Sequence, residues 1–159
     1  MTMLQKTKTF FSALACTGDF FQHFVLLAFR LYFGYNFFLA GYQKFHNIKE
    51  TAAFFGQLGI PLADAQAYLV ASVEMACGIL LIVGLASRLA AIPLIITMIV
   101  ALLTAHSKGA FQIFSNPSAF LSEMPVSYLI VSLVIFVFGA GWFSLDYLFG
   151  RFCCKSCKG

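Results

Sequence analysis

The sequence predicts an all-α membrane protein, a four-helix bundle with a short interfacial helix between its first two spans. It is 61% hydrophobic and 10% charged, with a mean hydropathy of +0.90, so it has too few polar residues to cover a water-soluble fold. Its long apolar stretches lack the alternation of barrel strands and match the roughly 20 residues that a helix needs to cross hydrocarbon. The four predicted spans are residues 20–42, 66–85, 89–105 and 124–143.

The chain divides into three segments. Residues 1–19 are expected to form a cytoplasmic or interfacial lead-in, residues 20–150 the four-helix membrane domain, and residues 151–159 a cytoplasmic tail rich in cysteine and lysine. An even number of spans places both termini on one side, and lysine and arginine are in excess there, which predicts cytoplasmic termini. The net charge of +4 lies largely in these flanks and favours membrane lipids with anionic headgroups. No nucleic-acid motif is present, and no nucleic acid partner is expected.

The connections between spans carry clear signals. Residues 48–58 have apolar side chains at helical spacing, which predicts the short interfacial helix. The Gly-Ile-Pro sequence at residues 59–61 should end it, because proline biases the preceding residue away from helical geometry. Between spans two and three, residues 84–88 are too few for anything but a tight turn, so these spans should be antiparallel neighbours. Pro93 lies early in the third span, where a kink is expected.

Two charged residues, Arg30 and Glu74, lie near the midpoints of the first and second spans. Counted from the span ends, their depths agree within roughly 5 Å, so they could form an ion pair, and either this pairing or a position facing a polar cavity is expected. A lone charge at the bilayer centre costs at least ~2.5–3.5 kcal/mol. The pair has two interpretations: a structural lock between the spans, or part of a polar pocket in which Arg30 donates to a quinone carbonyl or substrate oxygen and Glu74 exchanges a proton.

Other polar residues are candidates for the pocket or its entrance. Asn36 follows Arg30 by about two turns of the same span, and Lys44 and His106 lie at the predicted outer ends of spans one and three. The three histidines of the chain lie at two different membrane faces and cannot converge, so no metal site is predicted. No intrinsic cofactor is expected either, because no haem or flavin motif is present.

The C-terminal tail ends in a C-x-x-C pair, Cys154 and Cys157. This spacing suits a pair of redox thiols or half of a metal site. No second cysteine pair and no thioredoxin-like context accompany it. A flexible thiol tail is therefore the other interpretation.

With these landmarks in place, the sequence resembles the DoxX family of small four-span membrane proteins over residues 30–150. The landmarks, in chain order, are Arg30 with Gly34, residues 41–45 (GYQKF), 59–61 (GIP), 74–88 (EMACGILLIVGLASR) and 139–146 (GAGWFSLD). The resemblance implies a membrane-embedded helper in redox pathways, such as a subunit of a quinol oxidase or thiosulfate:quinone oxidoreductase, or a companion of thiol or oxidative-stress enzymes. It implies Arg30 and Glu74 as pocket residues and Lys44 and Arg88 as candidates at the two membrane faces.

The resulting hypothesis is a redox-associated subunit of the bacterial inner membrane that binds a quinone or a similar apolar carrier between its helices. It would work with a redox partner protein that supplies the metal or flavin, or assemble as a homo-oligomer. Whether the chain is itself catalytic, as a subunit of a membrane oxidoreductase, stays open. The alternative is non-enzymatic: a membrane scaffold, an assembly factor or a small transporter, in which Arg30 and Glu74 act only as a clamp.

Overall fold

The computed structural model describes residues 3–105, 117–139, 141 and 144–146, and this part of the chain is built from helices. The predicted all-α membrane class is confirmed, since within this described part three helices are long and apolar enough to cross a membrane, and the apolar α7 is shorter. The described elements are α1 (Met3–His46), α2 (Ile48–Gln57), α3 (Ala63–Val83), α4 (Ser87–Thr104), α6 (Pro117–Ser122) and α7 (Met124–Phe138).

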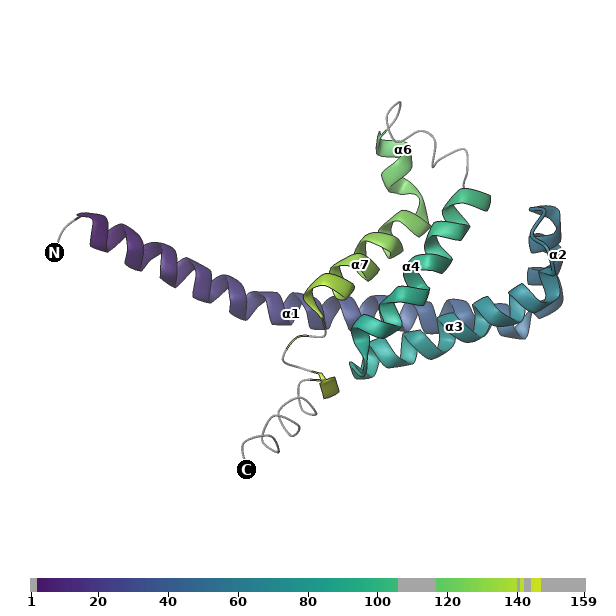
Figure 1. Ribbon diagram of the computed structural model, residues 1–159, viewed down its shortest axis with the longest axis horizontal. Coiled ribbons are helices and arrows are strands. Elements are labelled where there is room, and N and C mark those ends of the chain that lie inside the picture. Colours follow the sequence, from purple (N-terminus) through teal and green to yellow (C-terminus); the bar gives the residue numbers. More distant parts are fainter. Residues whose placement is uncertain (1–2, 106–116, 140, 142–143, 147–159) are drawn as a thin grey trace.

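The helices pack as two pairs. α1 and α3 lie side by side, and α4 packs along α7 in a second pair that is inclined to the first (Figure 1). α3 also contacts α4, and α7 contacts α1. α2 packs on α3 near the end at which α3 begins (Figure 1). Side chains from both pairs form the buried core, which includes Phe37, Leu81, Leu94 and Ile135.

Glycines set the close approach of α1 to α3. A Cβ atom at Gly41 would lie 2.6 Å from the backbone nitrogen of Met75, and one at Gly78 would lie 2.6 Å from that of Phe38. Real Cβ atoms do not approach backbone atoms so closely, so only glycine permits this contact. The contact fixes the antiparallel register in which residue 41 faces the middle of α3.

The short helix and the tight turn that the sequence predicts are both present. α2 occupies the place of the expected short helix and ends before the Gly-Ile-Pro sequence at residues 59–61. α3 ends at Val83 and α4 begins at Ser87, which leaves the tight turn that the sequence predicts. Gly84 closes α3 with φ +75°, a conformation that favours glycine, and its amide donates to the carbonyl of Leu80 at 2.8 Å.

Two boundaries differ from the prediction. α1 begins at Met3 and runs without a break through the expected boundary at residues 19–20, so its 44 residues extend over about 66 Å. The predicted continuation of the fourth span to residue 143 is wrong: α7 ends at Phe138 because Gly139 has φ +78°. Its 15 residues give a helix of about 22 Å, shorter than the hydrocarbon thickness.

Candidate functional site

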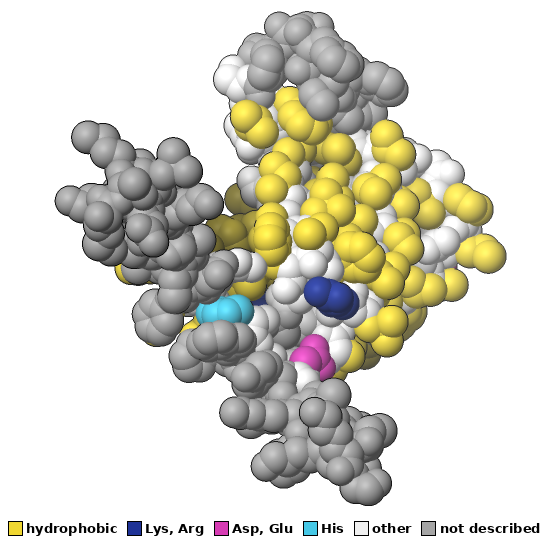
Figure 2. Space-filling model, turned by 60° about the vertical axis from the view of Figure 1, so that its left-hand side comes forward, with side chains coloured by type: hydrophobic (Ala, Val, Ile, Leu, Met, Phe, Trp, Pro, Cys, Tyr) yellow, Lys and Arg dark blue, Asp and Glu magenta, His cyan; other side chains and the backbone are white. Residues whose placement is uncertain are grey.

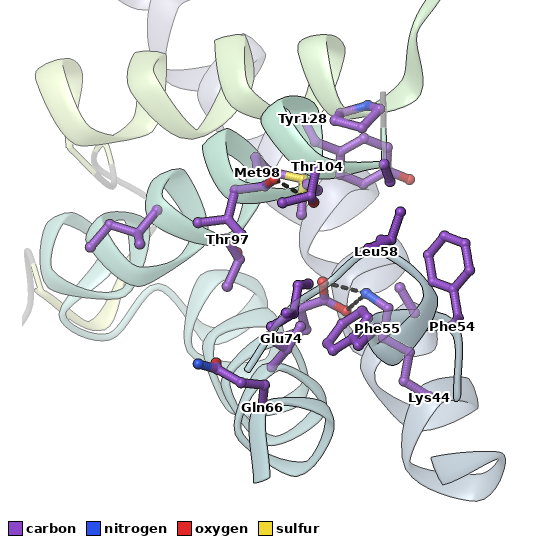
Figure 3. Close-up of a pocket in the computed structure, with 18 of the residues that line it drawn as sticks. Lys44, Phe54, Phe55, Leu58, Gln66, Glu74, Thr97, Met98, Thr104 and Tyr128 are labelled. Carbon is purple, nitrogen blue, oxygen red and sulfur yellow. Dashed lines mark hydrogen bonds and ion pairs between the residues drawn. The ribbon is translucent and has the colours of Figure 1, made fainter. Parts of the chain in front are cut away.

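A cavity of about 480 Å³ lies between the two helix pairs, with α2 contributing to its wall (Figure 3). Its walls are mostly apolar, and among the residues that the structure describes, the charged side chains that line it are Lys44 and Glu74. Among its lining residues are Phe37 and Lys44 of α1, Phe54 and Phe55 of α2 with Leu58 just after it, Gln66 and Glu74 of α3, Thr97, Met98 and Thr104 of α4, and Tyr128 of α7.

Lys44 and Glu74 form an ion pair in this cavity. Lys44 Nζ lies 2.5 Å from both Glu74 Oε1 and Oε2, so one ammonium group donates to both oxygens of the carboxylate. The Glu74 side chain is 1% exposed, whereas that of Lys44 is 32% exposed. Burying a carboxylate inside a membrane is unfavourable unless a cation accompanies it, and Lys44 is that cation. The pair therefore places a hydrogen-bond donor and an acceptor within an apolar cavity.

The predicted ion pair between Arg30 and Glu74 is wrong. Arg30 donates through Nε to the carbonyl of Leu81 at 2.9 Å and through Nη2 to that of Ile82 at 3.4 Å. The contacts at Gly41 and Gly78 place Gly41 opposite Glu74. Arg30 precedes Gly41 by eleven residues, so it lies roughly 16 Å away along α1. The prediction counted depth from the span ends and so missed that α1 brings Lys44 to the level of Glu74.

Arg30 instead belongs to a second, structural cluster at the turn between α3 and α4. Asp146 Oδ1 accepts from the Ala86 amide at 2.6 Å and Oδ2 from the Ser87 amide at 3.0 Å, at the start of α4. The Asp146 amide donates to the Gly84 carbonyl at 3.1 Å, and the Asp146 carboxylate attracts Arg30 through space. Arg30 does not line the cavity. Its surroundings agree with the lock interpretation rather than with the pocket.

The other predicted site residues lie apart from the cavity or outside the described part of the chain. Asn36 does not line the cavity, and its Nδ2 donates to the Tyr32 carbonyl of the same helix at 2.7 Å. Arg88 is exposed near the end of α7 and donates through Nη2 to the Val137 carbonyl at 3.3 Å. The structure therefore brings together two of the predicted residues, Lys44 and Glu74. His106, Cys154 and Cys157 lie outside the described residues.

Sequence reasoning missed Tyr128 and Gln66, which also line the cavity. Tyr128 lies on α7, the shortest of the apolar helices, and Gln66 lies in the second turn of α3. A tyrosine within a mostly apolar run was the available signal. The direction in which the Tyr128 side chain points depends on how α7 packs. Helical periodicity does not reveal this in a segment that is apolar on all sides.

Membrane-length apolar helices around a cavity with a buried carboxylate and its lysine partner define a helical membrane protein with an intramembrane polar site. The chain belongs to the DoxX family, whose model matches residues 25–107. It is similar to the "Putative oxidoreductase CatD" of Bacillus subtilis (strain 168), with 31% identity over 120 residues, which cover 76% of this chain and 83% of that protein. No solved structure matches the chain.

A second relative is the "Uncharacterized membrane protein Rv3486" of Mycobacterium tuberculosis (strain ATCC 25618 / H37Rv). It is 33% identical over 128 residues, which cover 76% of this chain and 78% of that protein. An "Uncharacterized protein" of Haemophilus influenzae (strain ATCC 51907 / DSM 11121 / KW20 / Rd) is 27% identical over 127 residues, which cover 77% of this chain and 82% of that protein.

Proposed function

We propose that this protein is a redox-associated accessory subunit of the bacterial inner membrane and that its cavity binds a quinone or a similar apolar carrier. The observation that carries the proposal is the Lys44–Glu74 ion pair inside an apolar cavity of about 480 Å³. Membership of the DoxX family and the name of the Bacillus subtilis relative, "Putative oxidoreductase CatD", support a redox role. The electrons would be exchanged with a partner protein, or the chain would act as a homo-oligomer.

The residues of the cavity suit the head of such a carrier. A lysine ammonium has three donors, and two contacts to Glu74 leave one for a carbonyl oxygen of the head. The Glu74 carboxylate keeps lone pairs that can accept a hydroxyl proton, while Phe54 and Phe55 provide apolar surface for a ring. A bound quinone would supply two-electron, two-proton carrier chemistry. The protein's part is to bind and orient the head and to hold or accept a proton at Glu74.

The proposal includes an orientation in the membrane. Lysine and arginine are in excess around the termini, which favours cytoplasmic ends for the chain. Lys44 lies near the end of α1 that is remote from the N-terminus. With that orientation the cavity lies in the outer half of the membrane, within reach of a carrier that diffuses laterally in the bilayer.

The test is titration of the detergent-purified protein with a short-chain ubiquinone, with bound small molecules from the membrane identified by mass spectrometry. Lys44→Gln, Glu74→Gln and the double variant should each weaken ubiquinone binding by roughly 10- to 100-fold, the range for a lost hydrogen bond to a charged group. The double variant removes both charges together, so no unpaired charge is left buried. Lys49→Gln, on the exposed face of α2 and outside the cavity, is the matched control and should bind as the wild type does.

Two outcomes would contradict the proposal. The first is a wild-type protein that neither retains a quinone from the membrane nor binds the added ubiquinone. The second is binding that is equal in the wild type and in the folded double variant, which would show that the Lys44–Glu74 pair takes no part.

A further inference from the structure

Tyr128 is the polar side chain that α7 contributes to the cavity. It lies between full burial and exposure and lines the cavity together with Lys44 and Glu74. Figure 3 shows Tyr128 on the α7 side of the cavity, with the Lys44–Glu74 pair on the α1 and α3 side. The cavity therefore has polar groups on two opposed walls that belong to different helix pairs.

The ring of Tyr128 is held by two aromatic neighbours from α1. Its centroid lies 5.2 Å from that of Phe33 and 4.9 Å from that of Phe37, and both contacts are edge-on with interplanar angles of 83°. Edge-on contacts between aromatic rings stabilise a defined orientation. The hydroxyl is thus carried on a positioned ring.

The hydroxyl of Tyr128 makes no hydrogen bond with any residue that the structure describes. The two threonine hydroxyls in the cavity wall differ, because Thr97 donates to the Leu94 carbonyl at 2.9 Å and Thr104 to the Val100 carbonyl at 2.7 Å. Gln66 projects away from the Lys44–Glu74 pair in Figure 3. In an apolar interior a phenol hydroxyl is expected to have a partner. Tyr128 therefore offers the cavity a hydroxyl that the described protein does not use.

We propose that Tyr128 is a ligand-binding residue, whose hydroxyl holds one oxygen of a ring while the Lys44–Glu74 pair holds the oxygen at the opposite edge. The inference rests on the proposed function and narrows the substrate class to flat rings with oxygen atoms at opposed edges. An amphiphile whose single polar end binds the Lys44–Glu74 pair has no second oxygen atom to form a hydrogen bond with Tyr128. A ring with oxygen atoms at both edges would connect α7 to the pair of helices α1 and α3.

The experiment compares Tyr128→Phe with the wild type in detergent-purified full-length protein. Phenylalanine keeps the ring and its contacts and removes the hydroxyl alone. The matched control is Tyr35→Phe, which loses a hydroxyl from an α1 side chain that is 55% exposed and does not line the cavity. Each protein is titrated with a short-chain ubiquinone, which has two opposed oxygens, and with an alkylphenol of similar size, which has one. Thermal midpoints are recorded without ligand.

Tyr128→Phe should weaken ubiquinone binding by roughly 3- to 10-fold, the equivalent of one neutral hydrogen bond. Binding of the alkylphenol and the ligand-free thermal midpoint should match those of Tyr35→Phe. Equal losses for both probes would make Tyr128 a packing residue and overturn the inference alone. Unchanged ubiquinone affinity would also overturn the inference alone, whatever the thermal midpoint. A wild-type protein that binds no ubiquinone would overturn both the inference and the proposed function.

Discussion

Arg30 is fully buried, and its guanidinium ends at the carbonyl groups of the last turn of α3. The final carbonyls of a helix lack partners within the helix and carry partial negative charge, so a cation there is stabilised. Asp146 does the reverse at the first amides of α4, where a carboxylate is stabilised. One turn is thus held at both sides by side chains that come from far away in the sequence.

Replacing Arg30 by glutamine should destabilise the protein. The shorter neutral side chain loses charge-assisted hydrogen bonds and the attraction of Asp146, so the free energy of unfolding should fall by about 1.5–3 kcal/mol. The measurement is the loss of helical circular dichroism during titration of micelles with dodecyl sulfate. Arg88→Gln is the control, because Arg88 is exposed, and its effect should stay within about 0.5 kcal/mol. Equal stability of the Arg30 variant and the wild type would refute the lock role.

At the scale of elements, the contact of α1 with α3 decides which residues meet in the cavity. Gly41 lies against the backbone of α3 near Ala71 and Met75, and Glu74 Cβ is 3.1 Å from where a Cβ at Gly41 would be. Close approach of two helix backbones needs small residues in this way. The same contact aligns Lys44, one turn further along α1, with the Glu74 carboxylate.

Gly41→Ala should therefore push α1 away from α3. The added methyl group would overlap backbone atoms, which cannot move aside as a side chain end can, and overpacking of this kind costs about 1–3 kcal/mol. Gly56→Ala in α2 is the matched control, since nothing lies within 4 Å of its Cβ position. It should be neutral or stabilising by up to about 1 kcal/mol, because alanine favours a helix over glycine. Unfolding in dodecyl sulfate measures both, and equal stability of the two variants would contradict this account of the interface.

At the scale of the whole molecule, the surface is that of a protein immersed in lipid. Hydrophobic side chains cover most of the described face in Figure 2, and the coloured charged groups gather toward its lower end. Large apolar side chains such as Leu89 at 69% and Tyr32 at 66% are exposed on the spanning helices. In water such a surface would drive aggregation, whereas in a bilayer it faces acyl chains.

The short α7 makes the topology a sharp test of the whole arrangement. With α7 crossing the membrane as the fourth span, both termini should face the cytoplasm. Fusions of a fluorescent protein and of alkaline phosphatase to each end check this, because the first is active in the cytoplasm and the second only outside it. An active phosphatase at the C-terminus with an active fluorescent protein at the N-terminus would show that the chain crosses an odd number of times, and would reject the four-span topology. Active phosphatase at both ends would reject the proposed cytoplasmic termini.

How far the sequence alone reaches depends on whether a feature is local. Hydropathy over about 20 residues predicted the apolar helices, helical spacing predicted α2, and chain length predicted the tight turn before α4. The end of α7 was missed because an apolar run continues past Gly139, while the backbone there leaves the helix at positive φ. The family was predicted from ordered motifs, and several of these are now explained by packing, such as Gly41, Gly78 and Asp146.

The sequence by itself determined that this is a helical membrane protein with buried charge, because hydrophobicity and helical periodicity are properties of neighbouring residues. It also identified Glu74 and Lys44 as candidates. Only the tertiary structure decided that Glu74 pairs with Lys44 rather than Arg30, and that Tyr128 shares their cavity. The physical reason is register: which side chains meet depends on how far one helix slides along another, and that is set by backbone contact at glycines distant in sequence.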